Sequence, residues 1–241
     1  MAFSHGSTAR FLAGGQDLSS ATSTVSTPGD ADVADVTGFG NTAKVYIAGV
    51  KDAKLSASGF LRTDLNDLAW SSSDLHGYEF FGAQDNTVCF SHYPYGDAVG
   101  SRGKALIGSE TAFTVGAPIG DAASYSVEAQ SRVGAEPVIS HTTGTSYVTA
   151  GTAAVVDNAA ASTNGAAGYL HGLDLSAGTA VVKLQHSSDN VTFVDLITFA
   201  DVTTPRSCQR VTAAGTVRRY TRATWAVTGG SAIFHAGLAR L

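Results

Sequence analysis

The sequence predicts an all-β protein in two parts, and three observations lead to this prediction. Runs rich in Thr, Val, Tyr and Phe recur along the 241 residues and are separated by Gly, Pro, Asn and Asp. Residues 124–132 alternate between side chains suited to a core and polar side chains, as in a strand with one buried face. Beyond residue 168, strand-like runs return about every ten residues, a spacing typical of a β-sandwich or jelly roll.

The first part is expected to span residues 1–150 and to form a β-sandwich or barrel. One short helix is predicted at 63–73, because apolar residues fall at i, i+3 and i+4 behind the capping residue Thr63. The rest of this part is expected to be strands and turns. The predicted strands are residues 7–14, 21–27, 78–81, 87–92, 103–107, 110–115 and 124–132.

The segment around which the first part is organised reads VTGFGNTAKVYIAGVKDAKLSASGFL, residues 36–61. Two strand-like runs bracket a long glycine-containing loop, at about residues 36–55. A loop of this length in a compact β domain usually acts outside the domain, so we predict an arm that contacts another subunit. The apolar residues expected to be buried in that contact are Phe39, Val45, Tyr46, Ile47 and Val50.

The boundary between the two parts is predicted within residues 138–166, which are poor in charge and rich in Ala, Gly, Thr and Ser. The second part, residues 151–241, is expected to be a β-sandwich of the jelly-roll or immunoglobulin-like kind. Hairpin turns are predicted at 187–190 and at Gly229-Gly230. The predicted strands are residues 169–175, 180–186, 192–199, 207–213, 216–227 and 232–240.

Charge is unevenly distributed along the chain. Residues 1–137 hold 15 acidic against 8 basic side chains (net −7), and residues 138–241 hold 5 against 7 (net +2). An acidic surface repels phosphate, which disfavours ordinary DNA binding by the first part. Cys89 and Cys208 are the only cysteines, and we expect two buried free thiols in a protein made in a reducing cytoplasm. Neither a signal peptide nor a membrane-spanning segment is expected.

No motif indicates catalysis, a cofactor or a metal site. The seven histidines lie apart from one another, without the spacing of metal ligands, and no nucleophile elbow or phosphate-binding loop is present. The basic run Arg218, Arg219 and Arg222 lies among aromatic residues, as in a nucleic-acid or sugar patch. A strand would divide these arginines between its two faces, so we expect them to stack on aromatic rings or to pair with aspartates.

Four blocks in order also carry a family resemblance: MAFSHGSTARFLAGGQDLSS, DVTGFGNTAKVYIAGVKDAKLSASGFL, VVKLQHSSDNVTFVDLITF and RRYTRATW. Together they resemble the major tail (tail tube) proteins of long-tailed, siphovirus-type bacteriophages, over most of the chain. The resemblance implies a virion protein, made in the host cytoplasm, whose first domain forms hexameric rings. Stacked rings would form the tube for DNA ejection, with the second domain outside as a decoration. The partners implied are other copies of the chain and the tape-measure, tail terminator and distal tail proteins, with no membrane.

Within this resemblance, the acidic excess acquires a purpose, because a negative channel wall would keep DNA from sticking. The residues expected to face the channel are Asp30, Asp32, Glu110 and Glu128. The alternative from another class is a carbohydrate-binding or adhesive β-sandwich protein. Its candidate stacking residues are Trp70, Tyr169, Tyr220 and Trp225. A hydrolase would need a nucleophile that no motif presents.

Overall fold

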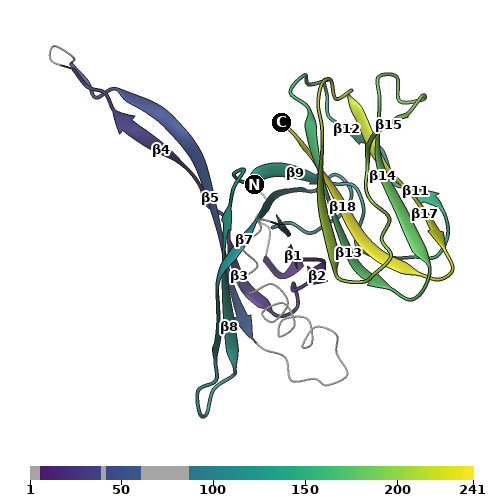
Figure 1. Ribbon diagram of the computed structural model, residues 1–241, viewed down its shortest axis with the longest axis horizontal. Helices are drawn as coiled ribbons and strands as arrows, with labels where there is room; N and C mark the ends of the chain where they lie inside the picture. Colours follow the sequence, from purple (N-terminus) through teal and green to yellow (C-terminus); the bar gives the residue numbers. More distant parts are fainter. Residues whose placement is uncertain (1–5, 39–41, 61–86) are drawn as a thin grey trace.

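The computed structural model describes residues 6–38, 42–60 and 87–241, and this part of the chain is almost entirely β-structure (Figure 1). A single 3-10 turn, η1 (Gly6–Thr8), precedes the first strand. The strands of the first part are β1 (Arg10–Ala13), β2 (Gln16–Asp17), β3 (Thr22–Ser26), β4 (Gly29–Asp35), β5 (Tyr46–Phe60), β6 (Val88–Tyr93), β7 (Arg102–Gly116), β8 (Ser124–Ser131) and β9 (Glu136–Ser140). Those that follow are β10 (Ser146–Tyr147), β11 (Gly151–Thr152), β12 (Val156–Asp157), β13 (Ala166–Leu175), β14 (Thr179–Ser187), β15 (Val194–Thr198), β16 (Ser207–Ala213), β17 (Tyr220–Thr228) and β18 (Ala232–Arg240).

The strands form two antiparallel sheets. The larger has 13 strands and follows the path β16-β13-β18-β9-β7-β6-β1-β2, with β8 on β7, β5 on β8, β3 and β4 on β5, and β10 on β18. The smaller has five strands, in the order β11-β17-β14-β15, with β12 on β17. The prediction of an all-β fold is therefore confirmed.

The C-terminal half is a sandwich of the smaller sheet on the β16-β13-β18 end of the larger one. Alternate residues of β14 and β18 point into the core between the sheets, among them Val182, Leu184 and Phe234. Gly168 of β13 lies where the layers meet most closely, because a Cβ there would lie 2.8 Å from the Phe199 ring. All six strands predicted for this half are present with small shifts of their ends.

One of the two predicted hairpin turns is wrong. Residues 187–190 do lie between β14 and β15, which pair as a hairpin. Gly229-Gly230, however, follows β17 in the smaller sheet and precedes β18 in the larger sheet, so this segment crosses between the layers. Glycines signal a turn from the sequence, but they do not indicate which sheet the next strand will join.

The N-terminal half has its own core around β1, β5, β6, β7 and β8. The alternation predicted for residues 124–132 is confirmed, since Tyr125, Val127 and Ala129 are buried while Glu128 is exposed. The strands predicted at 103–107 and 110–115 are a single strand, β7. Gly108 does not turn the chain: a Cβ there would lie 2.2 Å from the carbonyl oxygen of Gln130, so the glycine allows β8 to approach.

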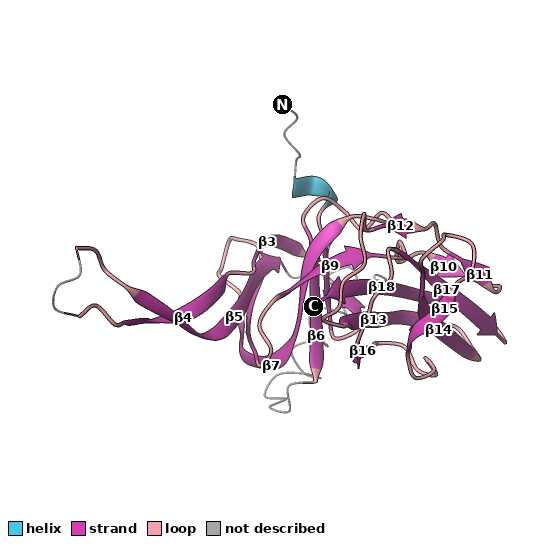
Figure 2. Cartoon of the chain, turned by 90° about the horizontal axis from the view of Figure 1, so that it is seen from above, coloured by secondary structure: helices cyan, strands magenta, loops and turns pink. Residues whose placement is uncertain are grey.

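The arm is a β-hairpin and not a loop. Strand β4 pairs with the first half of β5, from Gly29 opposite Ala53 to Asp35 opposite Tyr46. The loop is confined to residues 36–45, and the hairpin projects far from the body (Figures 1 and 2). Beyond the arm, β5 continues without a break into the body, where residues 54–60 pair with β8. The helix predicted at 63–73 and the strand at 78–81 lie outside the described residues.

The larger sheet joins the two halves. Strand β9 pairs with β7 on one side and with β18 on the other. A third apolar cluster lies where the halves meet, with Cys89, Tyr93 and Ala105 from the first half and Tyr169 and Ala239 from the second. The division at residue 150 stays a prediction, and the hydrogen-bonded sheet is continuous across it. Within the described residues, no helix has the length and hydropathy needed to span a bilayer.

Candidate assembly surfaces

The outer end of the arm carries four exposed apolar side chains and one exposed carboxylate, distributed over the two faces of the hairpin. Val36, Val45, Tyr46 and Ile47 are 44%, 44%, 52% and 58% exposed, and the side chain of Asp35 is exposed beside them. We refer to these five residues as the arm patch. A two-stranded ribbon has no second layer to cover its faces, so large apolar side chains on it remain in contact with water.

Hydrogen bonds order this end of the hairpin. The backbone N–H of Val36 donates to the carbonyl oxygen of Val45 at 2.9 Å. Thr37 donates to Asp35 Oδ1 from both its backbone N–H, at 3.0 Å, and its hydroxyl, at 2.5 Å. These bonds to the charged form lower the pKa of Asp35, so its carboxyl group is ionised at neutral pH. The arm patch therefore combines one fixed negative charge with four apolar side chains.

The five residues predicted for the subunit contact lie as follows. Val45, Tyr46 and Ile47 belong to the exposed arm patch. Val50 lies on β5 in the part of the arm that pairs with β4. Phe39 lies outside the described residues. Their burial between subunits stays a prediction.

A second hairpin tip, which the sequence analysis does not suggest, joins β7 to β8. It projects from the opposite side of the body from the arm (Figure 1). Ile119 at this tip is fully exposed and Val115 is 48% exposed. An isoleucine between Pro118 and Gly120, in a turn where polar residues are usual, is the sequence signal that could have revealed it.

The four acidic residues predicted to face a channel are placed differently from one another. Asp30 and Asp32 lie on β4 in the arm. Glu128 is exposed on β8. Glu110 is only 3% exposed, on the core side of β7, and burial raises its pKa to about 8. A buried and largely protonated carboxyl group does not fit an open, negative channel wall, so the structure corrects the expectation for Glu110.

A buried ion pair lies at the contact between the halves, which we call the seam. Arg210 of β16 donates to both carboxylate oxygens of Glu136, from Nε at 3.2 Å to Oε2 and from Nη2 at 2.5 Å to Oε1. The Tyr169 hydroxyl also donates to Glu136 Oε2, at 2.5 Å. Burial and the Glu136 charge raise the pKa of Tyr169, which stays a neutral donor. Glu136 and Arg210 are 74 positions apart, and no local pattern in the sequence brings the three residues together.

Three histidines are buried close to the seam. His171 and His235 are direct cross-strand partners on β13 and β18. His171 Nε2 bonds to the Ser91 hydroxyl at 2.9 Å, His235 Nε2 to the Ser140 hydroxyl at 3.1 Å, and His141 Nε2 to the Thr221 hydroxyl at 2.8 Å. Burial lowers the pKa of His171 to about 3 and that of His141 to about 4, so both rings are neutral. Among the described residues, no cluster of three or more His, Cys, Asp or Glu side chains is arranged to hold a metal ion.

The two cysteines also meet at the seam. Cys89 is buried, as predicted, but Cys208 is only half-buried. The backbone N–H of Cys89 donates to Cys208 Sγ at 3.3 Å. Both thiols are free. The two cysteines are far apart in the sequence, but they bring β6 and β16 into direct contact.

Two of the three arginines of the basic run, Arg219 and Arg222, stack or pair as expected. Arg219 makes a two-pronged ion pair with Asp157, with N–O distances of 2.7 and 2.6 Å, and its guanidinium lies 4.8 Å from the Tyr220 ring centre. Arg222 lies 3.8 Å from the ring centre of Phe193. Their planar groups are therefore already stacked within the chain.

Two of the residues proposed for glycan stacking pack against the core, Tyr169 fully buried and Trp225 half-buried. Tyr169 lies at the seam. Trp225 packs against Tyr147 and Phe234, with ring centres 4.5 and 5.9 Å away. Tyr220 is covered by Arg219, and Trp70 lies outside the described residues. None of the three described aromatic rings offers an open face on which a sugar could stack.

Comparison with known proteins gives structural matches alone. No protein-family model matches the sequence, and no curated protein matches it. A chain from the C6-symmetric tail of an empty gene transfer agent particle is 13% identical, with a TM-score of 0.37, over 48% of this chain and 80% of that one. A chain from the virion of a native gene transfer agent is 15% identical, with a TM-score of 0.42, over 55% and 97%.

A third match is the Dit protein of phage SPP1, described as a hub adsorption apparatus of phages that infect Gram-positive bacteria. It is 14% identical, with a TM-score of 0.38, and the match covers 96% of this chain and 99% of that one. At identities and TM-scores this low, the likeness carries no inference of function by itself.

Proposed function

We propose that this chain is a structural protein of the tail of a long-tailed bacteriophage, and that it assembles with its own copies into hexameric rings stacked as the tail tube. The observation that carries this proposal is the arm patch. An ordered ribbon with four exposed apolar side chains is costly for a monomer, and burying it against another copy would remove that surface from water.

The proposed contact joins the arm of one copy to the body of another. Two copies that exchange arms reciprocally would form a pair, whereas copies joined in one direction form head-to-tail contacts. Head-to-tail contacts generate closed rings, or open filaments when the rotation does not close. The arm strands also carry unpaired backbone edges, which pairing between copies would satisfy.

The remaining parts of the proposal follow from the sequence resemblance. The protein would be made in the host cytoplasm and would reside in the virion, next to the tape-measure, tail terminator and distal tail proteins. Asp30, Asp32 and Glu128 remain the proposed acidic residues of the DNA channel. The C-terminal sandwich would lie outside the tube, and the role of the whole chain would be structural and not enzymatic.

The proposal is tested by negative-stain microscopy of the purified protein. We expect rings or tubes from the unaltered chain, and folded but unassembled protein from the double variant Tyr46→Asp with Ile47→Asp. Val191→Asp is the matched control, because Val191 is an 82% exposed valine in the β14–β15 loop, far from the arm. Tubes of normal length from the double variant would contradict the proposed role of the arm.

A further inference from the structure

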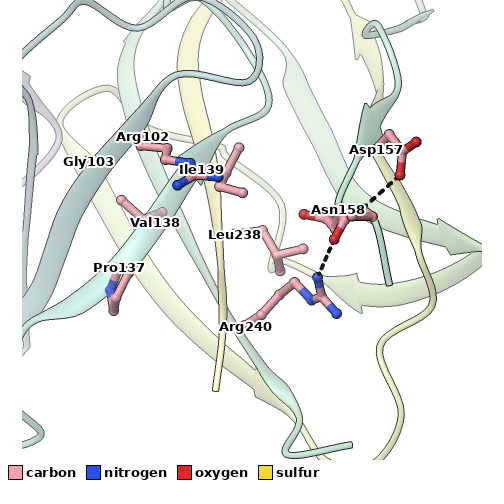
Figure 3. A pocket seen from close by; sticks show the side chains of 10 residues that line it. Arg102, Gly103, Pro137, Val138, Ile139, Asp157, Asn158, Leu238 and Arg240 are labelled. Carbon is pink, nitrogen blue, oxygen red and sulfur yellow. Dashed lines mark hydrogen bonds between the residues drawn. The ribbon is translucent and has the colours of Figure 1, made fainter. Parts of the chain in front are cut away.

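A pocket of about 340 Å³ opens on the body beside the end of β18 (Figure 3). Its floor is a row of cross-strand neighbours, Arg102 on β7, Ile139 on β9 and Leu238 on β18. Pro137 and Arg240 lie two residues further along their strands, on the same face. The loop that follows β12 forms one wall of the pocket.

The two arginines of the pocket have no carboxylate partner in the part of the chain that the structure describes. Arg240 donates only to neutral oxygens: Nε to the Ser162 hydroxyl at 3.2 Å, and Nη1 and Nη2 to the carbonyl groups of Asn158 and Ala160 at 3.4 and 2.7 Å. The side chain of Arg102 makes no hydrogen bond or ion pair with any residue in the described ranges, and the residue is exposed. Two positively charged groups therefore flank an apolar floor.

The one acidic residue in the lining does not balance them. Asp157 already forms the two-pronged ion pair with Arg219. Because Arg219 balances Asp157, the positive charges of Arg102 and Arg240 remain uncompensated in the lining. Guanidinium groups bind carboxylates well, and the floor of Ile139 and Leu238 favours a carboxylate that arrives among apolar groups.

We infer that this pocket receives the arm patch of a second copy, with the Asp35 carboxylate held between Arg102 and Arg240. The inference rests on the proposed function and names the surface that the arm contacts. Both hydrogen bonds from Thr37 go to Asp35 Oδ1, so Oδ2 faces no donor among the described residues. Tyr46 is the direct cross-strand partner of Asp35 and lies on the same face of the hairpin, so its ring would cover the apolar floor of the pocket while Asp35 meets the arginines.

The arm cannot reach the pocket of its own chain. Strand β5 runs unbroken from Tyr46 in the arm to Phe60 in the body, where its ladder with β8 fixes its direction. The arm consequently points away from the body (Figure 1), while the lining of the pocket includes Leu238 and Arg240 near the C-terminal end of β18. Only another copy can bring Asp35 to Arg102, so the contact joins two copies of the chain.

Charge exchange tests the inference. The variants are Arg102→Glu, Asp35→Lys and the two combined, with Arg132→Glu as the control for reversing an exposed arginine elsewhere on the body. We expect each single variant to raise the concentration needed for assembly at least tenfold in a pelleting assay. The combined variant should assemble at a lower concentration than either single variant, with full recovery opposed by Arg240, which stays positive beside the introduced lysine. The control should assemble like the unaltered protein.

An equimolar mixture of the two single variants should also assemble. In a six-membered ring the two variants can alternate. The lysine introduced at position 35 of one copy then meets the glutamate introduced at position 102 of the next. At the following contact the unaltered Asp35 meets the unaltered Arg102, so every contact in the ring joins opposite charges.

The outcomes distinguish a wrong assignment of the pocket from a wrong proposed function. Single variants that assemble normally, or a combined variant and a mixture that stay unassembled while the control assembles, would overturn the pocket and leave the tube proposal standing. Failure of the unaltered chain to assemble at any concentration would overturn both. Circular dichroism spectra identical to that of the unaltered protein establish that each variant is folded.

Discussion

Cys89 and Cys208 are 119 positions apart, yet the backbone N–H of the first donates to the sulfur of the second. Their contact joins β6 of the first half to β16 of the second. It belongs to the same seam as the Glu136–Arg210 ion pair and the buried histidines. The two halves are therefore held together by polar contacts that fix their relative position as well as by apolar packing.

Removing one partner of the seam ion pair should destabilise the protein strongly. Glu136→Ala leaves the Arg210 guanidinium without its buried carboxylate, and we expect a loss of about 3 kcal/mol in the free energy of unfolding. Urea denaturation provides the measurement. Asp195→Ala is the control, since it removes an exposed partner of Lys183 and should change stability little. Equal effects of the two substitutions would contradict the structural importance of the seam.

Stability should fall between pH 6.5 and pH 4. Burial lowers the pKa of His171 to about 3 and that of His141 to about 4, below the ordinary value of 6.5. The unfolded chain therefore binds more protons in this range, so stability is fully present above pH 6.5 and is lost as the pH falls toward the folded pKa values. Urea midpoints at a series of pH values measure the loss. His171→Gln should make the decline less steep, and an unchanged slope would argue against His171 as a contributor.

Glu110 should make the protein less stable as the pH rises, which is the opposite of the effect of the histidines. Burial raises its pKa to about 8 from an ordinary value of 4.5, so the stability associated with the protonated carboxyl is present below pH 4.5 and is lost as the pH rises through 8. Glu110→Gln keeps the shape without the charge. We expect this variant to raise the melting temperature more at pH 8 than at pH 5. A gain of equal size at both pH values would mean that ionisation is not the cause.

Gly15 should tolerate no side chain. It has a φ of +79°, and a Cβ would lie 2.4 Å from the carbonyl oxygen of Ser207, in the other half of the chain. Gly100 has a similar φ of +91° with nothing within 4 Å, so it is a matched control for backbone strain alone. We expect Gly15→Ala to lower the melting temperature well beyond Gly100→Ala. If both substitutions lower the melting temperature equally, the backbone around Ser207 can move away from the added methyl group without loss of stability.

Truncation after residue 150 should leave a poorly soluble fragment. It removes β18, the partner of β9, and uncovers apolar residues such as Tyr93 and Val138 at the seam. We expect aggregation, measured as the soluble yield and by binding of a hydrophobic dye. A monomeric, cooperatively folding fragment would instead support an independent first domain.

The sequence predicts a strand well where the pattern lies within that strand. Tyr125 to Ser131 alternate, and their burial alternates in the same way, because a period of two is a local property of a strand. Gly108 is misleading because a glycine that admits a neighbouring backbone looks the same as one that turns the chain. The run of apolar residues in the arm is visible in the sequence, but its pairing depends on a partner strand, β4, that the charge-rich residues 29–35 do not suggest.

The seam and the pocket are beyond the reach of sequence patterns for a different reason. Glu136 and Arg210, like Arg102 and Arg240, are ordinary charged residues on separate strands. They come together because β9 lies between β7 and β18 in the sheet. The same local sequence pattern is compatible with other strand orders. Local patterns predict strands, whereas contacts between distant strands emerge only when the order of the sheet is known.

The unbroken course of β5 has a mechanical consequence. A pull on the arm along its length reaches the body through the backbones of both arm strands, since β4 continues from β3 and β5 is held by ladders to β3 and β8 over residues 54–60. A force directed along a strand loads these hydrogen bonds in shear, so that many must yield together, whereas a force across the strand would peel them one after another. The arm is therefore built as a stiff tether, most resistant to tension in the direction in which it projects.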